Sequence, residues 1–307
     1  MIYTLGETVL DILFKDGKPV SATPGGSMLN TAVSLGRMGV PVSFISEYAA
    51  DTTGTLIKDF LNENSVDTSF VSNHLDGKTS LALAFLDEKN NAAYSFYKDF
   101  PKERLNVPDP CFKMGDVLLF GSFFSLDTAL RPKLLHLLNL AKDAGALLIY
   151  DPNFRKPHLK DLPKVKAFIE QNIQLADIIK ASDEDFENIF SISNSRQAFK
   201  LLYEFGPKTL IFTQNSRGVD FKTPAFEFQE AVPKLQPIST IGAGDSFSAG
   251  LLYAYSKKST TFETFNQFTI QTWKTMVKCG IAFATDVCLS YENYISRPFA
   301  SKFSIEE

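Results

Sequence analysis

The chain has 307 residues, of which 44% are hydrophobic and 21% are charged, and its formal net charge is -4. A disordered chain would have a lower apolar content and a larger charge imbalance, so we expect a folded protein with one large domain or two modest ones. The acidic balance argues against a protein that is held to nucleic acid by a generally basic surface.

The cysteines and the start of the chain give no sign of export or membrane insertion. Cys111, Cys279 and Cys288 are odd in number and lack C-x-x-C spacing, so we expect reduced thiols rather than disulfides or a zinc site. The first residues lack a basic n-region and a long apolar stretch, and no window approaches the ~18 apolar residues of a membrane span. We therefore expect a cytoplasmic protein with no membrane or nucleic-acid partner.

The first hundred residues combine parts of a larger sheet with two hairpins. A strand, a helix and a second strand are predicted at 2–6, 27–38 and 41–46. One predicted hairpin pairs 9–14 with 19–23, and the other pairs 79–87 with 92–97 around a turn at Asn90-Asn91. We expect the two hairpins, within segments of about 8–24 and 78–100, to form a small β-sheet lid at one edge of the larger sheet.

From about residue 105 onward, short apolar runs alternate with stretches of helical periodicity. Strands are predicted at 117–120, 147–150, 178–180 and 209–213, and helices near 127–144, 162–174, 183–190 and 195–205. Apolar runs with few polar interruptions suit strands that are buried on both faces, so the pattern predicts an α/β fold with a parallel sheet covered by helices. No repeat or linker divides the chain, so residues 1–307 are expected to form one domain.

A glycine-rich stretch, Ile241-Gly242-Ala243-Gly244-Asp245-Ser246, precedes a predicted helix. Small residues there let backbone N–H groups approach an anion closely, and the positive end of the helix dipole favours that anion. The stretch matches neither G-x-x-x-x-G-K-S/T nor G-x-G-x-x-G. It predicts an anion-binding helix start with Asp245 in the first turn, although an ordinary capped helix after a glycine-rich turn accounts for the same residues.

Three other elements place polar groups where a ligand would bind. Pro24-Gly25-Gly26 opens a helix whose first turn carries Asn30, a donor and acceptor for a hydroxylated ligand, and the structural alternative is a tight turn with an exposed amide. Asp151-Pro152-Asn153-Phe154-Arg155 follows an apolar strand, at the sheet edge where open α/β folds bind ligands. Asp11 lies in the first predicted hairpin and, taken alone, suits a solvated turn.

Taken together and in this order, these elements resemble the ribokinase-like (PfkB) carbohydrate kinases over residues 2 to about 298. The resemblance rests on Gly6-Glu7 with Asp11, Gly25-Gly26 with Asn30, Asp151-Pro152-Asn153-Phe154-Arg155, Lys180-Ala181-Ser182-Asp183-Glu184-Asp185, and Gly242-Ala243-Gly244-Asp245. Within the family, the Gly-Glu and Asp-Pro-Asn-x-Arg elements look most like fructokinases. The resemblance implies a three-layer α/β/α domain with a mainly parallel central sheet and a lid that closes over a sugar.

The resemblance also implies a reaction, the ATP-dependent transfer of a γ-phosphoryl group to the hydroxyl of a sugar, with a ketohexose such as fructose as the leading acceptor. Asp245 matches the family's catalytic base, and the N–H groups of Gly242, Ala243 and Gly244 match its anion hole. Because phosphoryl transfer needs positioning and charge stabilisation more than covalent chemistry, a carboxylate beside an anion hole is a suitable minimum apparatus.

By the same match, further residues would bind the two substrates. Those expected at the sugar hydroxyls are Asp11, Gly25, Gly26 and Asn30, and those expected near the sugar or the transferred phosphate are Asn153 and Arg155. Those expected at the nucleotide are Lys180, Ser182, Thr213 and Gly218. Asp185 falls on the element that organises magnesium in the family, usually through water, so the expected cofactor is Mg²⁺ with ATP as co-substrate.

Four positions depart from the family pattern. Asp185 replaces a glutamate, and Asn215 stands where the nucleotide loop usually has its first glycine, a place where Asn tolerates a left-handed backbone better than most residues. Ser239 replaces an aspartate, and Leu289-Ser290-Tyr291 lacks the usual late Gly-Ala. The last two departures lie where many members bind a monovalent cation, so we predict weak or absent activation by potassium.

Two other functions stay open at this stage. The same fold would serve a kinase for a keto-deoxy sugar acid or a nucleoside, and Lys98, Lys102 and Arg104 near the lid would attract an anionic acceptor unless they are ordinary solvated charges. The departures also allow a catalytically weakened protein that binds sugar or nucleotide and regulates another process.

The second predicted hairpin suggests how two copies of the chain would associate. Its alternating Leu81, Leu83 and Phe85 need cover on one face of the lid sheet. A homodimer formed through the lid would supply that cover, and so would packing on the chain's own domain.

Overall fold

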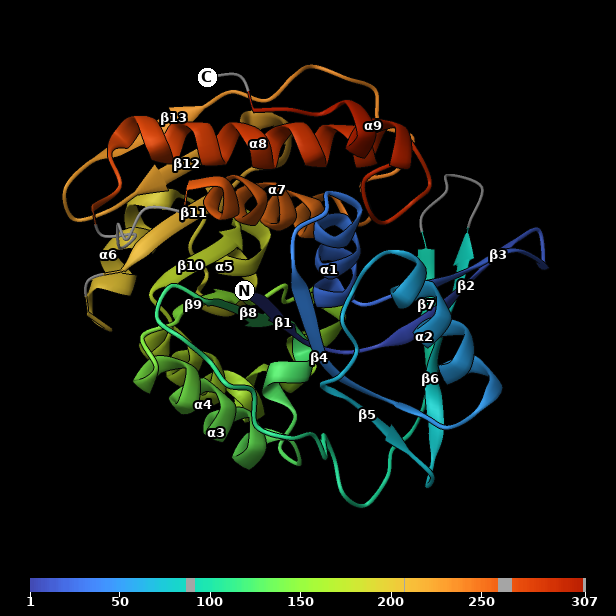
Figure 1. Ribbon diagram of the computed structural model, residues 1–307. Helices are drawn as coiled ribbons and strands as arrows, with labels where there is room; N and C mark the ends of the chain where they lie inside the picture. The colour runs from blue at the N-terminus through green and yellow to red at the C-terminus, as the bar shows by residue number, and fades with distance from the viewer. Residues whose placement is uncertain (87–91, 207, 259–266, 306–307) are drawn as a thin grey trace.

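The computed structural model describes residues 1–86, 92–206, 208–258 and 267–305. Within them, the larger sheet runs in the order β13-β12-β11-β10-β9-β8-β1-β4-β5 (Figure 1). Its strands are β1 (Ile2–Leu5), β4 (Val42–Ala49), β5 (Val71–His74), β8 (Val117–Gly121), β9 (Leu147–Asp151), β10 (Ile178–Ser182), β11 (Thr209–Thr213), β12 (Val219–Lys222) and β13 (Glu227–Glu230). Neighbouring strands are parallel from β11 through β5, and β12 and β13 are antiparallel.

Helices cover both faces of this sheet (Figure 1). One apolar core lies under α1 (Ser27–Arg37), α2 (Thr52–Glu63), α7 (Ala243–Lys258), α8 (Ile270–Cys288) and α9 (Arg297–Lys302). The other lies under α3 (Arg131–Asp143), α4 (Leu162–Leu175), α5 (Asp183–Phe190) and α6 (Ser195–Tyr203). Neighbouring strand residues such as Leu118 and Leu119 belong to opposite cores, because alternate side chains of a strand point to opposite faces. The predicted three-layer α/β/α class is confirmed.

A second sheet, here called the lid sheet, lies beside the large one (Figure 1). It has the order β3-β2-β6-β7 and is built from β2 (Val9–Lys15), β3 (Lys18–Gly25), β6 (Lys78–Leu86) and β7 (Ala92–Asp99). Both hairpins pair as the sequence predicts, and β2 joins them by pairing parallel to β6. The predicted turn at Asn90-Asn91 lies outside the described residues.

Some elements carry little sequence signal and form through their neighbours. Strand β5 is Val-Ser-Asn-His, which is not an apolar run, and it is held by parallel pairing with β4. Helix α2 buries only Gly54, Ile57 and Leu61, and its start is fixed by Asp51, whose side chain accepts a hydrogen bond from the Gly54 N–H. Neither element was predicted from the sequence, because pairing and capping rather than apolar periodicity define them.

The topology marks where a ligand binds. Strand β1 lies between β8 and β4, so the order of the strands along the chain reverses at β1. In open α/β sheets, ligands bind beyond the carboxyl ends of the strands at such a reversal. There Glu7 follows β1 and Ser122 follows β8, and the Ser122 hydroxyl donates to the Glu7 carboxylate at 3.3 Å. Asp151 and Ser182 end β9 and β10 at the same edge.

In the part of the chain that the structure describes, no helix combines the length and the apolar character needed to cross a bilayer.

Candidate active site

Asp245 lies in the first turn of α7 and is held by side chains of α1. Its Oδ1 accepts a hydrogen bond from the Ser27 hydroxyl at 2.5 Å, and its Oδ2 accepts one from the Asn30 amide at 2.8 Å. Its backbone carbonyl accepts a third bond from the Thr31 hydroxyl at 2.9 Å. Because Asp245 is only 6% exposed, the bonds from Ser27 and Asn30 replace water that would otherwise solvate the carboxylate.

The turn before Asp245 requires glycine at position 242. Gly242 has φ of +79°, and a Cβ there would lie 2.1 Å from the carbonyl oxygen of Asn293. The turn brings the first N–H groups of α7 to the end of the helix, where the dipole is positive. The Ala243 N–H makes only a long bond, 3.3 Å to the carbonyl of Thr240. An anion at this position would therefore meet a weakly bonded donor, the Ala243 N–H.

The two ends of the Asn30 side-chain amide differ in their hydrogen bonding. Its amide N–H is taken by Asp245, whereas its Oδ1 is buried and has no hydrogen-bond partner among the described residues. A buried acceptor without a partner costs free energy, which a ligand hydroxyl would recover by donating to it. Asn30 and Asp245 together therefore provide two adjacent acceptors for one hydroxylated ligand.

Lys180 and Asp151 form a buried ion pair beside the start of α7. The Lys180 Nζ donates to the Asp151 Oδ2 at 2.7 Å, and both residues are at most 5% exposed. The same Nζ lies 3.2 Å from the position that a Cβ on Gly244 would take. Burial raises the pKa of Asp151 to about 6, and the charge of Lys180 opposes that rise. Burial disfavours the Lys180 ammonium, but the Asp151 carboxylate reverses this and raises the pKa of Lys180.

Asp11 lies within β2, on the edge of the site. A Cβ on Gly25 would lie 2.1 Å from its Oδ2, so glycine is needed at position 25 for Asp11 to keep its place. Burial and the nearby Glu7 carboxylate raise the pKa of Asp11 to about 7, whereas Arg155 lowers it. Gly26 is required as well, because it has φ of +124° and its Cβ would meet the Glu7 carbonyl at 2.2 Å.

Asn153 and Arg155 follow β9 and lie beside each other. Asn153 has φ of +42°, and its side-chain oxygen accepts a bond from the Arg155 Nε at 3.3 Å. Arg155 is exposed and its charge acts on Asp11, so its guanidinium faces the same region from solvent.

Ser182 and Asp185 form a capping box at the start of α5. The Ser182 N–H and hydroxyl both donate to the Asp185 Oδ2 at 2.7 Å, and the Phe154 N–H donates to its Oδ1 at 2.6 Å. With three donors already on its carboxylate, Asp185 fits a metal role only through water. Among the described residues, no group of three or more His, Cys, Asp or Glu side chains is arranged to hold a metal ion.

The predicted nucleotide loop begins next to this capping box. Thr213 ends β11 and lies in register with Ser182, while Gly218, with φ of +107°, precedes β12. A Cβ on Gly218 would lie 2.5 Å from the Glu230 carbonyl, so glycine is needed there. Asn215 has φ of +50°, the left-handed conformation that asparagine tolerates.

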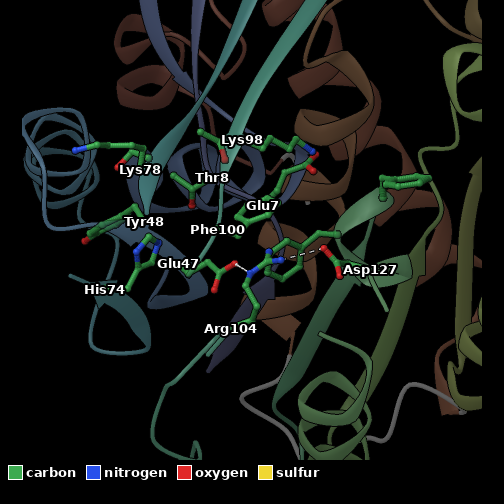
Figure 2. Close-up of a pocket in the computed structure, with 14 residues that line it drawn as sticks. Glu7, Thr8, Glu47, Tyr48, His74, Lys78, Lys98, Phe100, Arg104 and Asp127 are labelled. Atoms are coloured by element: carbon green, nitrogen blue, oxygen red, sulfur yellow. Dashed lines mark hydrogen bonds and ion pairs between the residues drawn. The ribbon is translucent and has the colours of Figure 1, made fainter. Parts of the chain in front are cut away.

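A pocket between the large sheet and the lid sheet is lined by Glu7, Glu47, Phe100 and Arg104 (Figure 2). The Arg104 guanidinium lies 3.5 Å from the ring centre of Phe100 and donates to Glu47 at 2.5 Å and to Asp127 at 3.1 Å. Two carboxylates therefore offset the charge of Arg104, which ties the end of β7 to the large sheet. Lys102 is exposed, as expected for a solvated charge.

Sequence reasoning identified Asp245, Asn30 and Lys180 but missed three of their partners. Ser27 and Thr31 were not assigned a role, and Asp151 was quoted only as part of a motif. The available signal was spacing, since residues 27, 30 and 31 lie one turn apart on one face of a helix. That face could not be connected to Asp245, more than two hundred residues away, without the fold.

Comparison with known proteins identifies the family. The model of the pfkB family of carbohydrate kinases matches residues 2–298. The chain belongs to this family. It is therefore an ATP-dependent carbohydrate kinase, which transfers a phosphoryl group to a sugar hydroxyl.

Similar proteins of this pfkB family include several fructokinases. The chain is 26% identical to the fructokinase of Vibrio alginolyticus over 261 residues, covering 83% of this chain and 84% of that protein. It is 29% identical to the fructokinase of Rhizobium leguminosarum bv. trifolii over 261 residues, covering 82% of this chain and 78% of that protein.

Solved structures of the pfkB fold superpose well on this chain. Aminoimidazole riboside kinase from Salmonella enterica, complexed with aminoimidazole riboside and an ATP analogue, gives a TM-score of 0.83 at 20% identity and covers 98% of this chain and 97% of its own. Fructokinase from Vibrio cholerae O395, bound to fructose, ADP and calcium ion, gives 0.82 at 20% identity and covers 95% and 94%. At these identities, the likeness establishes the fold.

The raised pKa of Asp11 predicts a pH-dependent cost in stability. Folding raises its pKa from 3.8 to about 7, so the folded state keeps a proton that the unfolded state has lost, and stability falls as pH rises through that range. Asp11→Asn removes this titration. Its melting temperature should exceed that of the wild type by about 3 °C or more at pH 8, and the difference should shrink toward pH 4.5.

The same variant should bind sugar less well, with KM raised about tenfold or more, because the carboxylate acceptor is lost. Thermal melts across pH and sugar kinetics at pH 8 measure both effects. A difference in melting temperature that does not change with pH would contradict the assignment.

Proposed function

We propose that this carbohydrate kinase phosphorylates a ketohexose, with fructose as the acceptor. The observation that carries the proposal is the pairing of Asp245 with an unpartnered acceptor on Asn30, directly beside the start of α7. The fructokinase names of the relatives from Vibrio alginolyticus and Rhizobium leguminosarum support fructose as the acceptor.

In the proposed reaction, the Asp245 carboxylate accepts the proton of the attacking sugar hydroxyl. The γ-phosphoryl group forms its new bond to that oxygen as its bond to ADP breaks. The N–H groups of Gly242, Ala243 and Gly244 receive the negative charge on the transferred group, at the positive end of α7. The protein forms no covalent bond to either substrate in this reaction, so positioning of the substrates supplies most of the rate acceleration.

The sugar would be held from two sides. From the lid sheet, Asp11 offers carboxylate oxygens, and Gly25 and Gly26 allow the backbone to come close. From the side of the large sheet, Asn30 of α1 offers its Oδ1, which has no partner among the described residues. Asn153 and Arg155, which follow β9, would lie near the sugar or the transferred phosphate. Movement of the lid sheet, formed within segments of about 8–24 and 78–100, would then exclude water from the site.

The nucleotide would lie along the edges of β10 and β11. Lys180 would approach its phosphates, since two of its three N–H groups have no partner among the described residues. Ser182, Thr213 and Gly218 would line the rest of this path. Mg²⁺ bound with ATP would neutralise phosphate charge, with Asp185 acting through water. The chain would perform this reaction in the cytoplasm.

Replacing the base tests the proposal directly. Asp245→Asn keeps the size of the side chain but cannot take a proton, so kcat should fall about 10²–10⁴-fold. Because an amide nitrogen cannot accept a hydrogen bond, the variant also loses one of the two bonds that α1 donates. The measurement is ATP turnover with a panel of fructose, other neutral sugars, keto-deoxy sugar acids and nucleosides. Glu184→Gln, an exposed change in the first turn of α5, is the control and should keep wild-type turnover.

Fructose should give the highest kcat/KM in this panel. If a sugar acid or a nucleoside gives a higher kcat/KM than fructose, that compound and not fructose is the acceptor. If the wild type turned over none of them, the protein would instead be a sugar- or nucleotide-binding regulator.

Potassium should have little effect on the rate. The Ser239 hydroxyl already accepts the Ile241 N–H at 3.2 Å, and Leu289 and Tyr291 are exposed apolar side chains, so these positions do not fit a monovalent cation. Exchanging all sodium for potassium should change turnover less than about twofold. An increase of tenfold would show that a cation site exists despite the missing acid.

A homodimer through the outer face of the lid sheet is proposed as well. Leu83 and Phe85 lie on the face opposite Asp11 and Ala82, by the register of β2 with β6, and Phe85 is 42% exposed. Sedimentation of the wild type should give a dimer at micromolar concentration, and Leu83→Glu should give a monomer. The control is Leu75→Glu, at a fully exposed loop position, and a monomeric wild type would contradict the proposal.

A further inference from the structure

Ser27 is a polar residue of α1 to which the proposed reaction gives no role. Its side chain is buried, at 6% exposure, and its hydroxyl donates to the Asp245 Oδ1 at 2.5 Å. This is the single side-chain hydrogen bond of Ser27 within the described residues. A serine buried in this way, with its one hydroxyl donor directed at a carboxylate, acts on that carboxylate.

The two side chains that hold Asp245 have different further contacts. Asn30 donates to Asp245 through its amide and keeps Oδ1 for a ligand, so a change at Asn30 alters both the base and the sugar site. Among the described residues, the Ser27 hydroxyl makes its hydrogen bond to the base alone. Its effect on catalysis can therefore be separated from an effect on sugar binding.

The bond from Ser27 does not block the reaction. A carboxylate offers about four lone-pair positions, and Ser27 and Asn30 occupy one on each oxygen. The remaining positions are available to the acceptor hydroxyl. With both oxygens held, rotation of the carboxylate about its χ2 bond is restricted, and the proton acceptor stays aimed at one place.

The Thr31 hydroxyl donates a hydrogen bond to the backbone carbonyl of Asp245 at 2.9 Å. Helix α1 therefore holds both the main chain and the carboxylate of Asp245. The acceptor oxygen of Asn30 is on the same helix. The distance between the base and the sugar hydroxyl is therefore set within one rigid element. Errors of about 1 Å in that distance can cost about a hundredfold in rate.

We propose that Ser27 is a positioning residue for phosphoryl transfer, which fixes the orientation of the Asp245 carboxylate through its hydroxyl. The inference rests on the proposed role of Asp245 as the base. Ser27 itself neither takes the proton nor binds the sugar.

Ser27→Ala tests this proposal in the full-length enzyme with ATP and fructose. We expect kcat to fall about tenfold to a hundredfold, while KM for fructose stays within about twofold of the wild type. A merely structural role would instead lower the melting temperature without a selective loss of kcat.

Ser34→Ala is the matched control. Ser34 is a buried serine on the same helix, and its hydroxyl contacts Ser246 of α7 at 3.4 Å rather than Asp245. It should keep kcat within about twofold of the wild type. An equal loss of kcat in Ser34→Ala would overturn the assignment to Ser27.

The double variant Ser27→Ala with Asp245→Asn gives the sharpest readout. If Ser27 acts only through the carboxylate, removing it from the Asp245→Asn enzyme should cost less than about twofold in the residual rate. A loss as large as that in the wild-type background would overturn the proposal, as would a kcat for Ser27→Ala within twofold of the wild type.

Two results separate this inference from the proposed function. If the wild type turns over no sugar, both the proposed role of Asp245 as the base and the inference about Ser27 are wrong. The inference alone is wrong if the wild type is active, Asp245→Asn is inactive and Ser27→Ala keeps the kcat of the wild type.

Discussion

The carboxylate of Asp245 is held by two side chains from a helix that lies more than two hundred residues earlier in the chain. Ser27 and Asn30 each take one oxygen, at 2.5 and 2.8 Å. This contact requires that the starts of α1 and α7 meet at the carboxyl edge of the sheet. The glycines at 25, 26 and 242 lie just before these two helix starts, and a Cβ at any of the three would collide with an oxygen of Asp11, Glu7 or Asn293.

The second constraint is electrostatic. Asp151, Asp185 and Asp245 are all at most 6% exposed, and Lys180 is the buried cation whose pKa responds to all three. Burying carboxylates is costly unless each has donors, and here each has them: Lys180 for Asp151, the α5 capping box for Asp185, and α1 for Asp245. Each buried carboxylate is therefore stabilised by donors of the protein itself, and the Lys180 ammonium keeps donors for a phosphate.

Asp11 shows the cost of such a site. Its pKa of about 7 means that the folded protein holds this carboxylate under conditions that favour its protonated form. The structure keeps it because Gly25 makes room for it and Arg155 partly offsets the burial. Active sites commonly carry strain of this kind at the expense of stability.

Much of the fold was predictable because buried parallel strands have a plain signal. Strand β9 is apolar up to Asp151, its last residue, and both hairpins of the lid sheet showed alternation. Strand β5 and helix α2 escaped prediction because pairing and capping define them. Within the site, Asp245, Asn30 and Lys180 were found through motifs. Their partners Ser27 and Asp151 were not, because a hydrogen bond between distant segments leaves no trace in local spacing.

The central claim is that the acceptor hydroxyl of the sugar lies between Asn30 and Asp245, next to the start of α7. A crystal structure with fructose and a non-hydrolysable ATP analogue tests it most directly. We expect one fructose hydroxyl to donate to the Asp245 carboxylate and a neighbouring hydroxyl to donate to the Asn30 Oδ1, with the γ-phosphate on the N–H groups of Gly242 to Gly244. A sugar bound elsewhere, with Asn30 Oδ1 still unpartnered, would contradict it.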